Sequence, residues 1–207
     1  LSEADLATLA TLGSVLPALG ILMLRESSGS AGLDGVPRLA EGLAAGALPA
    51  VTYLGICGMH VGVAGASAIA AALDRGALPR LKLLALTNAA ISDAALVALA
   101  PALRRLPALE SLHLSHNLFG DEGLAALVAP PPPAGAPPPP TGGLTKLKAL
   151  YLSRTQITDA GCATLVAVLD SGALPALEDI ELDGTPASDA AKEAVHAALA
   201  RSYYAER

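Results

Sequence analysis

The histidines and cysteines are the residues best suited to chemistry, and their spacing does not assemble a catalytic or metal site. His113 and His116 lie three positions apart across a predicted strand and turn. That spacing does not bring two ring nitrogens onto one metal ion as helical spacing would. Cys57 and Cys162 lie 105 positions apart, so we expect two free thiols and a reducing, intracellular compartment. These residues predict no metal, cofactor or disulfide.

The glycine-rich stretches and the hydroxyl residues do not indicate an enzyme. The segment 55–65 contains neither a phosphate-binding G-x-x-x-x-G-K-[ST] loop nor a spaced G-x-G-x-x-G after a strand. No Ser, His and Asp set can be nominated, because distant positions of a repeat array stay far apart in space. We therefore expect a protein without catalytic activity.

Charge and composition narrow the class of partner. The chain has 13 Lys+Arg against 19 Asp+Glu, so no basic stripe is available for nucleic acid. Residues 42–73 carry no Asp, Glu, Lys or Arg and are long enough to span a bilayer, but Gly and Pro interrupt them. The repeat described next explains their apolar positions, so we expect no membrane span. A protein partner remains the expectation.

Six segments of the form L-x-x-L-x-L recur along the chain, and any site must be positioned by the elements that these repeats form. They begin at Leu19, Val51, Leu81, Leu109, Leu147 and Leu177. In five of them a small residue follows nine positions after the last strand aliphatic, and eleven positions after it in the first. Aliphatics then follow four and eight positions later, except that the fourth repeat keeps only Leu127. Alternation predicts a strand, whereas i, i+4, i+8 spacing predicts a helix.

Helix start signals precede most of the predicted helices. Ser92-Asp93, Gly120-Asp121, Thr158-Asp159 and Ser188-Asp189 stand just before the helical stretches. Such residues accept hydrogen bonds from the first helical N–H groups and suit the helix dipole. Each repeat is therefore expected to run strand, turn, helix, loop.

The repeat resembles the ribonuclease-inhibitor-like class of leucine-rich repeats. Asn117 stands where that family has a ladder of asparagines, and Asp121 and Gly123 follow it. At the other ladder positions stand Ser27, Met59, Ala89, Thr155 and Thr185, so a full ladder cannot form. The resemblance implies an α/β solenoid, a short right-handed horseshoe arc with a concave parallel sheet and convex helices.

The domain organisation follows from these repeats. Residues 1–15 are expected to form a partial repeat or a helical cap, 16–201 six leucine-rich repeats, and 202–207 a polar tail. A proline-rich insertion interrupts the fourth repeat at 130–143. It is either a tolerated spacer or a ligand for proline-binding domains.

The concave face holds the candidate partner-binding residues, because alternate strand side chains point away from the core. They are Met23, Arg25, Tyr53, Leu83, His113, Tyr151, Glu181 and Asp183. With Ile21, three of them form an apolar patch, unless the register differs or the amino-terminal segment covers it. The group Glu178, Asp179, Glu181 and Asp183 either attracts a basic partner or protects the last sheet edge from strand pairing.

Three functions fit these features. The leading one is a protein–protein interaction module that binds its partner on the concave sheet. A second is a structural accessory subunit, held in a larger complex for which an organellar location is left open. A third is a GTPase-activating or sensor-type repeat domain, since Ran GTPase-activating proteins share the long repeat, with Arg25 as the concave arginine. We expect a cytoplasmic location, with an organellar one after transit-peptide removal left open.

Overall fold

The computed structural model describes residues 3–11, 16–25, 35–128 and 143–205, in which seven helices alternate with six strands. The elements are α1 (Glu3–Thr11), β1 (Ile21–Arg25), α2 (Gly35–Ala44), β2 (Tyr53–Cys57), α3 (Gly62–Asp74), β3 (Leu83–Ala85), α4 (Asp93–Arg105), β4 (Ser111–His113), α5 (Asp121–Val128), β5 (Ala149–Tyr151), α6 (Asp159–Asp170), β6 (Asp179–Glu181) and α7 (Asp189–Ala205). No helix within the described ranges is long and apolar enough to cross a membrane. Except for Gly143, the proline-rich insertion lies outside these ranges.

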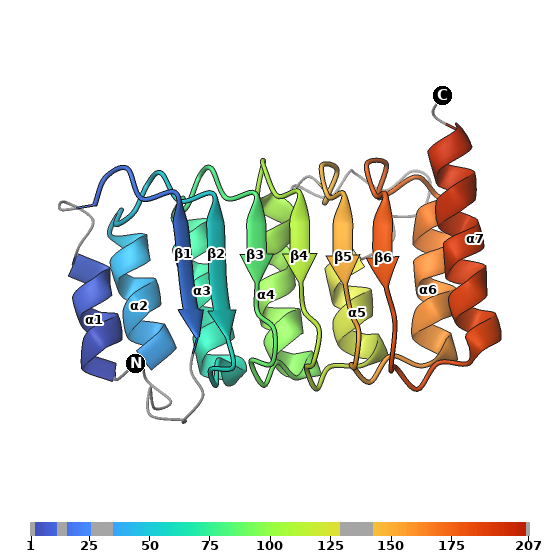
Figure 1. Cartoon of the computed structure of the whole chain (residues 1–207), viewed down its shortest axis with the longest axis horizontal. Helices are drawn as coiled ribbons and strands as arrows, with labels where there is room; N and C mark the ends of the chain where they lie inside the picture. Colours follow the sequence, from blue (N-terminus) through green and yellow to red (C-terminus); the bar gives the residue numbers. More distant parts are fainter. Residues whose placement is uncertain (1–2, 12–15, 26–34, 129–142, 206–207) are drawn as a thin grey trace.

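The strands form one parallel sheet in chain order, β1 to β6 (Figure 1). Leu22 pairs with Leu54, Leu54 with Leu84, and the row continues to Ile180. This register aligns the six L-x-x-L-x-L strings position by position. The predicted alignment is therefore confirmed.

The core lies between the sheet and a single layer of helices. Strand aliphatics such as Leu84 and Leu112 and helix aliphatics such as Leu99 and Leu165 have no exposed surface. Because the inward side chains of each strand meet the i, i+4, i+8 stripe of a helix, every repeat adds one similar layer. A core built almost entirely from aliphatics needs few aromatic anchors, and Phe119 is the one buried phenylalanine.

The array curves with its sheet on the inner side. Figure 1 shows the helices behind the strands, with α1 lying outside β1 and α7 outside β6. Neighbouring helices need about 10 Å of spacing and neighbouring strands about 4.8 Å. The helical layer must therefore follow the longer path of the arc, and the exposed sheet face is concave.

Asn117 closes the turn after β4 as the ladder position predicts. Its side chain is buried, accepts hydrogen bonds from the N–H groups of Ala89 and Ile91, and donates to the carbonyls of Leu86 and Leu114. The other described ladder positions differ. Met59 and Ala89 are buried without side-chain hydrogen bonds, while Thr155 and Thr185 each donate one bond to the carbonyl three residues earlier. The ladder is incomplete, as expected, and Ser27 lies outside the described residues.

The predicted hydrogen bonds at the helix starts are confirmed for the hydroxyl residues and differ for the aspartates. The hydroxyls of Ser92, Thr158 and Ser188 accept hydrogen bonds from N–H groups in the first turn of their own helices. Three aspartates instead serve the following repeat. Asp93 accepts from Gly120 and Gly123, Asp121 from Thr158, and Asp159 from Ser188. These carboxylates point towards the next repeat, where the first N–H groups of the helix have no acceptor within the helix itself.

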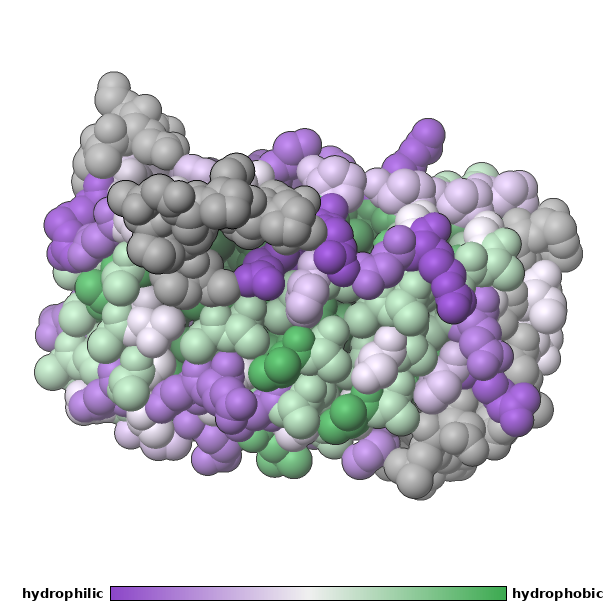
Figure 2. All heavy atoms as spheres, turned by 180° about the vertical axis from the view of Figure 1, so that it is seen from behind, coloured by the Kyte–Doolittle hydropathy of each residue, from purple (hydrophilic) through white to green (hydrophobic). Residues whose placement is uncertain are grey.

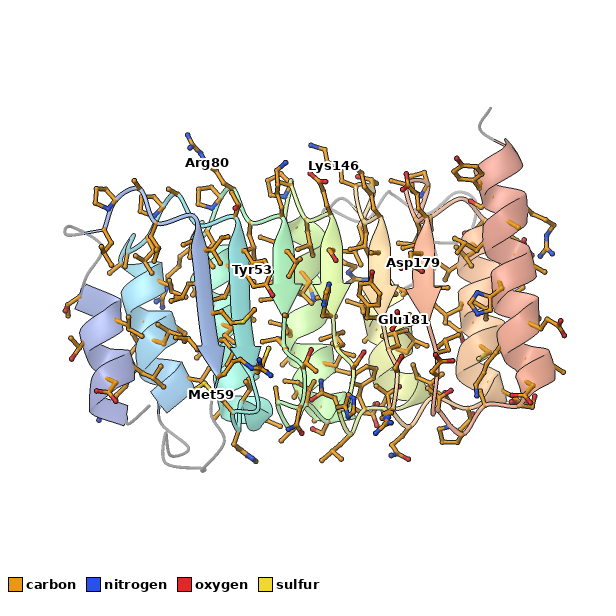
Figure 3. All side chains as sticks on the ribbon, in the orientation of Figure 1. Tyr53, Met59, Arg80, Lys146, Asp179 and Glu181 are labelled. Atoms are coloured by element: carbon orange, nitrogen blue, oxygen red, sulfur yellow. The ribbon has the colours of Figure 1, made fainter. Side chains whose placement is uncertain are left out.

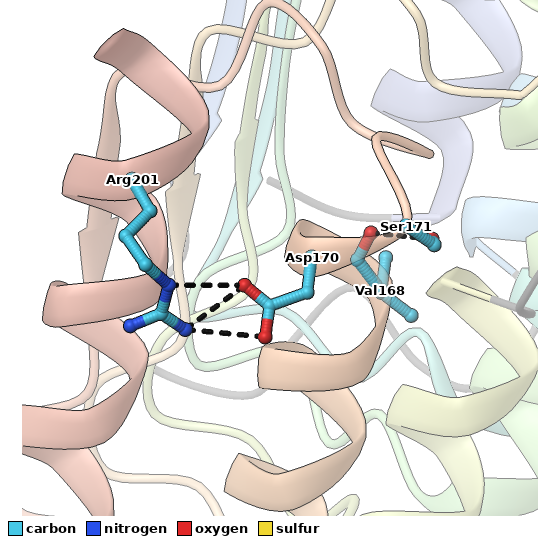
Figure 4. Close-up of polar contacts among 4 residues, drawn as sticks. All are labelled: Val168, Asp170, Ser171 and Arg201. Carbon is cyan, nitrogen blue, oxygen red and sulfur yellow. Dashed lines mark hydrogen bonds and ion pairs between the residues drawn. The ribbon is translucent and has the colours of Figure 1, made fainter. Parts of the chain in front are cut away.

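Ion pairs join the carboxyl-terminal ends of two neighbouring helix pairs. Arg201 on α7 donates to both carboxylate oxygens of Asp170 on α6, and Ser171 donates to the carbonyl of Val168 beside it (Figure 4). Arg105 on α4 donates from two of its nitrogens to one carboxylate oxygen of Asp74 on α3. Because α7 continues to Ala205, it includes residues that the sequence assigns to a polar tail.

Candidate functional site

The concave face is formed by alternate residues of the six strands. Tyr53 lies on β2 and Asp179 and Glu181 on β6, towards opposite ends of the sheet (Figure 3). Outward side chains on β1 and β6 are exposed, and those on β2 to β5 are half-buried apart from the small residues Gly55 and Ala85. All eight candidate residues therefore lie on one surface.

The amino-terminal part of this surface is apolar and is filled by Met23 and Tyr53. Ile21 and Met23 are 64% and 48% exposed. A methyl group placed on Gly55 would lie 3.2 Å from Tyr53 Cε1 and 3.4 Å from Met23 Cγ, so the two side chains close over this glycine. Leu83 pairs with Tyr53 on the next strand. We name Ile21, Met23, Tyr53 and Leu83 the apolar patch.

Cys57 and Arg25 lie near the Tyr53 side chain. Burial, followed by the charge of Cys57, raises the pKa of Tyr53, and Arg25 opposes this shift. The phenol therefore stays a neutral hydrogen-bonding group beside a cation. Amphipathic tyrosines of this kind, with an apolar ring and a polar tip, are frequent at protein interfaces.

The carboxyl-terminal part of the surface contains a polar cluster around His113. The His113 and Tyr151 rings meet edge to face with centroids 4.4 Å apart, and Ser111 Oγ lies 2.9 Å from His113 Nε2. Desolvation by burial lowers the pKa of His113, although Glu181 partly offsets it. A hydrogen bond to Asp179 is the main cause that raises the pKa of Tyr151. We name Ser111, His113, Tyr151, Asp179 and Glu181 the polar cluster.

Carboxylates dominate the end of the surface. Asp179, Glu181 and Asp183 are all exposed, and Ser153 donates a hydrogen bond to Glu181. At the rim where the strands begin, Glu110 bridges Lys82 and Lys148 at 3.1 and 3.3 Å. Hydrogen bonds from these two lysines lower the pKa of Glu110. The middle of the rim therefore places two cations around one carboxylate, in contrast to the carboxylate-rich end.

The described residues of this face offer apolar, hydrogen-bonding and charged groups to a ligand. Ser111 and His113 are in hydrogen-bond contact, but nothing described orients the second histidine nitrogen or stabilises a developing oxyanion. No group of three or more His, Cys, Asp or Glu side chains in the described ranges is placed to hold a metal ion. Cys57 and Cys162 are both free thiols.

The helices form the convex face of the array. Apolar and polar side chains are interspersed over the helices (Figure 2). A hollow of about 280 Å³ lies between α6 and α7, where Cys162, Val166 and Ala194 are among the lining residues. Burial raises the pKa of the Cys162 thiol, which keeps it protonated and unreactive.

The structure brings the candidates together in two groups and adds partners that were not among them. Met23, Arg25, Tyr53 and Leu83 meet at one end, and His113, Tyr151 and Glu181 meet near the other, with Asp183 just beyond β6. Ser111 and Asp179 line the same face and were not among the eight candidates, although Asp179 was expected in the acidic group. Ser111 bonds to His113 on its own strand, and Asp179 bonds to Tyr151 on the neighbouring one. Their alternate position in the repeat was the available signal.

Comparison with known proteins agrees with this geometry. A family model described as Leucine Rich repeat matches residues 106–128 and 143–166, which fall in the fourth and fifth repeats. The chain is a leucine-rich-repeat solenoid. The solved structure of the leiomodin-1 actin-binding site 2 superposes with a TM-score of 0.55 at 17% identity, covering 85% of this solenoid and 92% of that chain.

A second solved structure, internalin C2 of Listeria monocytogenes, is 21% identical and has a TM-score of 0.39. It covers 91% of the solenoid and 77% of that chain. No curated protein sequence matches significantly.

Proposed function

We propose that this leucine-rich-repeat solenoid is a non-enzymatic interaction module that binds a protein partner on its concave sheet face. The observation that carries the proposal is the apolar patch beside a half-buried aromatic and histidine cluster on that face. Side chains there point away from the core, so the fold does not require their chemistry. Contiguous exposed apolar surface with aromatic anchors is typical of binding sites.

The chemistry along this face would bind a partner in one orientation. Met23, Tyr53 and Leu83 favour an apolar anchor, His113 and Tyr151 offer hydrogen bonds, and Glu181 and Asp183 favour a basic segment. Opposite charge at one end would fix the register of the partner and speed its encounter. Leiomodin-1, which has the same fold, is named for an actin-binding site, and this precedent supports protein binding in general.

The subclass and the compartment are part of the same proposal. A helix of 8 to 17 residues follows every strand, which fits the long repeat of the ribonuclease-inhibitor-like class. The two free thiols fit a reducing, intracellular environment.

Affinity capture from the native source with matched variants tests the function. Leu83→Asp places a charge in the apolar patch, whereas Val97→Asp places the same charge on the exposed side of α4. A genuine partner is retained by the wild type and Val97→Asp and lost by Leu83→Asp and Tyr53→Ala. Circular dichroism must show all four proteins folded. A specific partner that all four retain equally would place binding elsewhere and overturn the proposal.

A further inference from the structure

An aromatic pair in the polar cluster lies on internal strands of the concave face. The His113 and Tyr151 rings, on β4 and β5, meet edge to face with their centroids 4.4 Å apart. Both side chains point away from the core and are half-buried, so the fold does not require two rings there. Aromatic ring faces attract cations, and half-buried aromatic side chains are frequent anchors at binding surfaces.

Carboxylates continue the rows of side chains in which these rings lie. In the sheet register, His113 lies beside Tyr151, and Tyr151 lies beside Glu181. In the adjacent row, Asp179 lies beside Ala149, whose side chain is a single methyl group. Asp179 and Glu181 both extend from β6 (Figure 3). Because neighbouring strands are about 4.8 Å apart, both carboxylates are within reach of a group placed over the Tyr151 ring.

The carboxylates at this end of the face have no cation beside them. Other surface carboxylates, such as Glu110 and Asp170, form ion pairs with lysine or arginine. Asp179, Glu181 and Asp183 form none with any residue in the described ranges. The hydrogen bonds that two of them accept come from hydroxyl groups, which leave the negative charge uncompensated.

The lysines and arginines of the chain itself do not supply this cation within the described ranges. Of its 13 Lys and Arg residues, only Arg207 lies outside those ranges. On the neighbouring strand and turn, Lys148 pairs with Glu110, and Arg154 donates only its backbone N–H to the carbonyl of Asp183. The formal net charge of the chain is -6, which favours association with a cationic partner.

Protection of the sheet edge accounts for only part of this arrangement. Charged side chains on β6 oppose pairing with another strand. His113 and Tyr151 lie on internal strands, where edge protection requires no particular side chain. Burial lowers the pKa of His113, so its ring is neutral near pH 7 and does not repel a cation. The polar cluster therefore combines aromatic surface, hydrogen-bond acceptors and uncompensated negative charge.

We propose that the polar cluster is the binding site for an arginine or lysine side chain of a protein partner. The proposal rests on the concave-face function and names the chemistry that this end of the face recognises. The cation lies over the Tyr151 ring, where the carboxylates of Asp179 and Glu181 accept its hydrogen bonds. A planar guanidinium group can stack on the ring and donate to both carboxylates, so arginine should bind more tightly than lysine.

A matched pair of peptides tests the site in the full chain. The probe is acetylated and amidated Gly-Ser-Arg-Ser-Gly, and the control peptide carries citrulline, an uncharged analogue of arginine, at the same position. Proton–nitrogen NMR spectra at constant low ionic strength detect weak binding through shifts of the backbone signals of Tyr151 and Glu181. We expect the arginine peptide to bind about tenfold or more tightly than the citrulline peptide.

Variants of the chain separate the polar cluster from the general negative charge. Glu181→Gln should weaken binding of the arginine peptide severalfold, whereas Glu122→Gln, which removes the same charge from the exposed start of α5, should not. Tyr151→Leu should weaken it severalfold, and Tyr151→Phe, which keeps the ring, should bind more tightly than Tyr151→Leu. The spectrum of each free variant shows whether it is folded.

Several outcomes would overturn the proposal. They are no binding of the arginine peptide, equal binding of the citrulline peptide, equal effects of Glu181→Gln and Glu122→Gln, and equal affinities of Tyr151→Leu and Tyr151→Phe. Binding that appears only in Arg207→Ala would also overturn it, because an arginine of the chain itself would then occupy the site. The concave-face function is tested separately, by loss of the captured partner in Leu83→Asp, so the two can fail independently.

Discussion

The side-chain oxygen of Asn117 lies 3.0 Å from the backbone nitrogen of Ala89, in the preceding repeat. The same oxygen accepts from Ile91, while Nδ2 donates to Leu86 and Leu114 at 2.7 and 2.8 Å. One buried amide thus satisfies backbone groups of two successive turns. The neighbouring threonines make one backbone bond each, so the cohesion of the turns is unequal along the array.

Replacing Asn117 with alanine should cause the larger loss of stability. Four buried backbone groups would lose their partner, at a cost of about 3 kcal/mol or more in the free energy of unfolding. Thr155→Val removes a single bond to Leu152 and should cost about 1 kcal/mol. Urea denaturation of both variants measures the difference. Equal losses would show that the asparagine adds nothing beyond an ordinary side-chain bond.

Gly161 on α6 is required by the close approach of Asp121. A methyl group there would collide with the Asp121 carboxylate and lie 2.8 Å from Ile157 Cγ2. Alanine stabilises an open helical site by about 1 kcal/mol relative to glycine. Here we expect Gly161→Ala to destabilise by about 1–3 kcal/mol, because Asp121 must release Thr158.

Thermal unfolding can separate crowding from helix propensity at Gly161. Ser67→Ala on the exposed side of α3 is the control, and it should change the unfolding free energy by no more than about 0.5 kcal/mol. An increase in the unfolding free energy of Gly161→Ala would show that the Asp121 carboxylate does not crowd this position of α6.

The fold was predictable because the spacing of aliphatic residues within each repeat distinguishes its strand from its helix. Alternating aliphatics in the strands and the i, i+4, i+8 stripe in the helices are local signals, and their recurrence fixed the register that pairs Leu54 with Leu84. Bonds between repeats were harder to predict. Asp93, Asp121 and Asp159 stand at equivalent positions, but a sequence does not say whether a carboxylate turns to its own helix or to the next.

The candidate site was predictable as a surface and not as a set of contacts. Alternation identified which side chains face away from the core, including Tyr53 and His113. It did not reveal that Met23 folds over Gly55 against Tyr53, or that Ser111 bonds to His113. Both contacts depend on side-chain rotamers, and the first also depends on how neighbouring strands pack, which the alternation pattern does not encode.

A left-handed backbone position recurs just before each described ladder residue. Gly58, Asn88, His116, Arg154 and Gly184 have φ of 70°, 52°, 60°, 55° and 69°. A residue with a side chain at such a φ destabilises the folded state by about 1–2 kcal/mol. Glycine avoids this strain, but its greater conformational freedom in the unfolded chain offsets part of the gain.

Arg154→Gly should therefore raise the free energy of unfolding by up to about 1 kcal/mol. The reverse change, Gly184→Ala, should lower it by a similar amount, since the nearest atom to the new methyl group is the flexible Arg154 Cγ. Urea midpoints compare the two variants with the wild type. A loss of stability in Arg154→Gly would mean that its side-chain contacts outweigh the backbone strain.

His113 should make the stability of the solenoid depend on pH in the mildly acidic range. Burial lowers the pKa of the folded histidine below the value of 6.5 expected when it is unfolded. As the pH falls through that value, the unfolded chain binds a proton that the folded chain does not, so the free energy of unfolding decreases. The contribution is complete above the unfolded pKa and is lost as the pH falls towards the folded one.

Comparison with His113→Gln isolates this effect, because glutamine keeps a polar side chain and does not titrate. Melting temperatures of both proteins, measured between about pH 7.5 and 5, should diverge on the acidic side, with the wild type falling faster. The partial compensation by Glu181 predicts a steeper fall in Glu181→Gln, which removes the one charge that favours the protonated ring. Parallel curves for the wild type and His113→Gln would show that burial does not perturb this histidine.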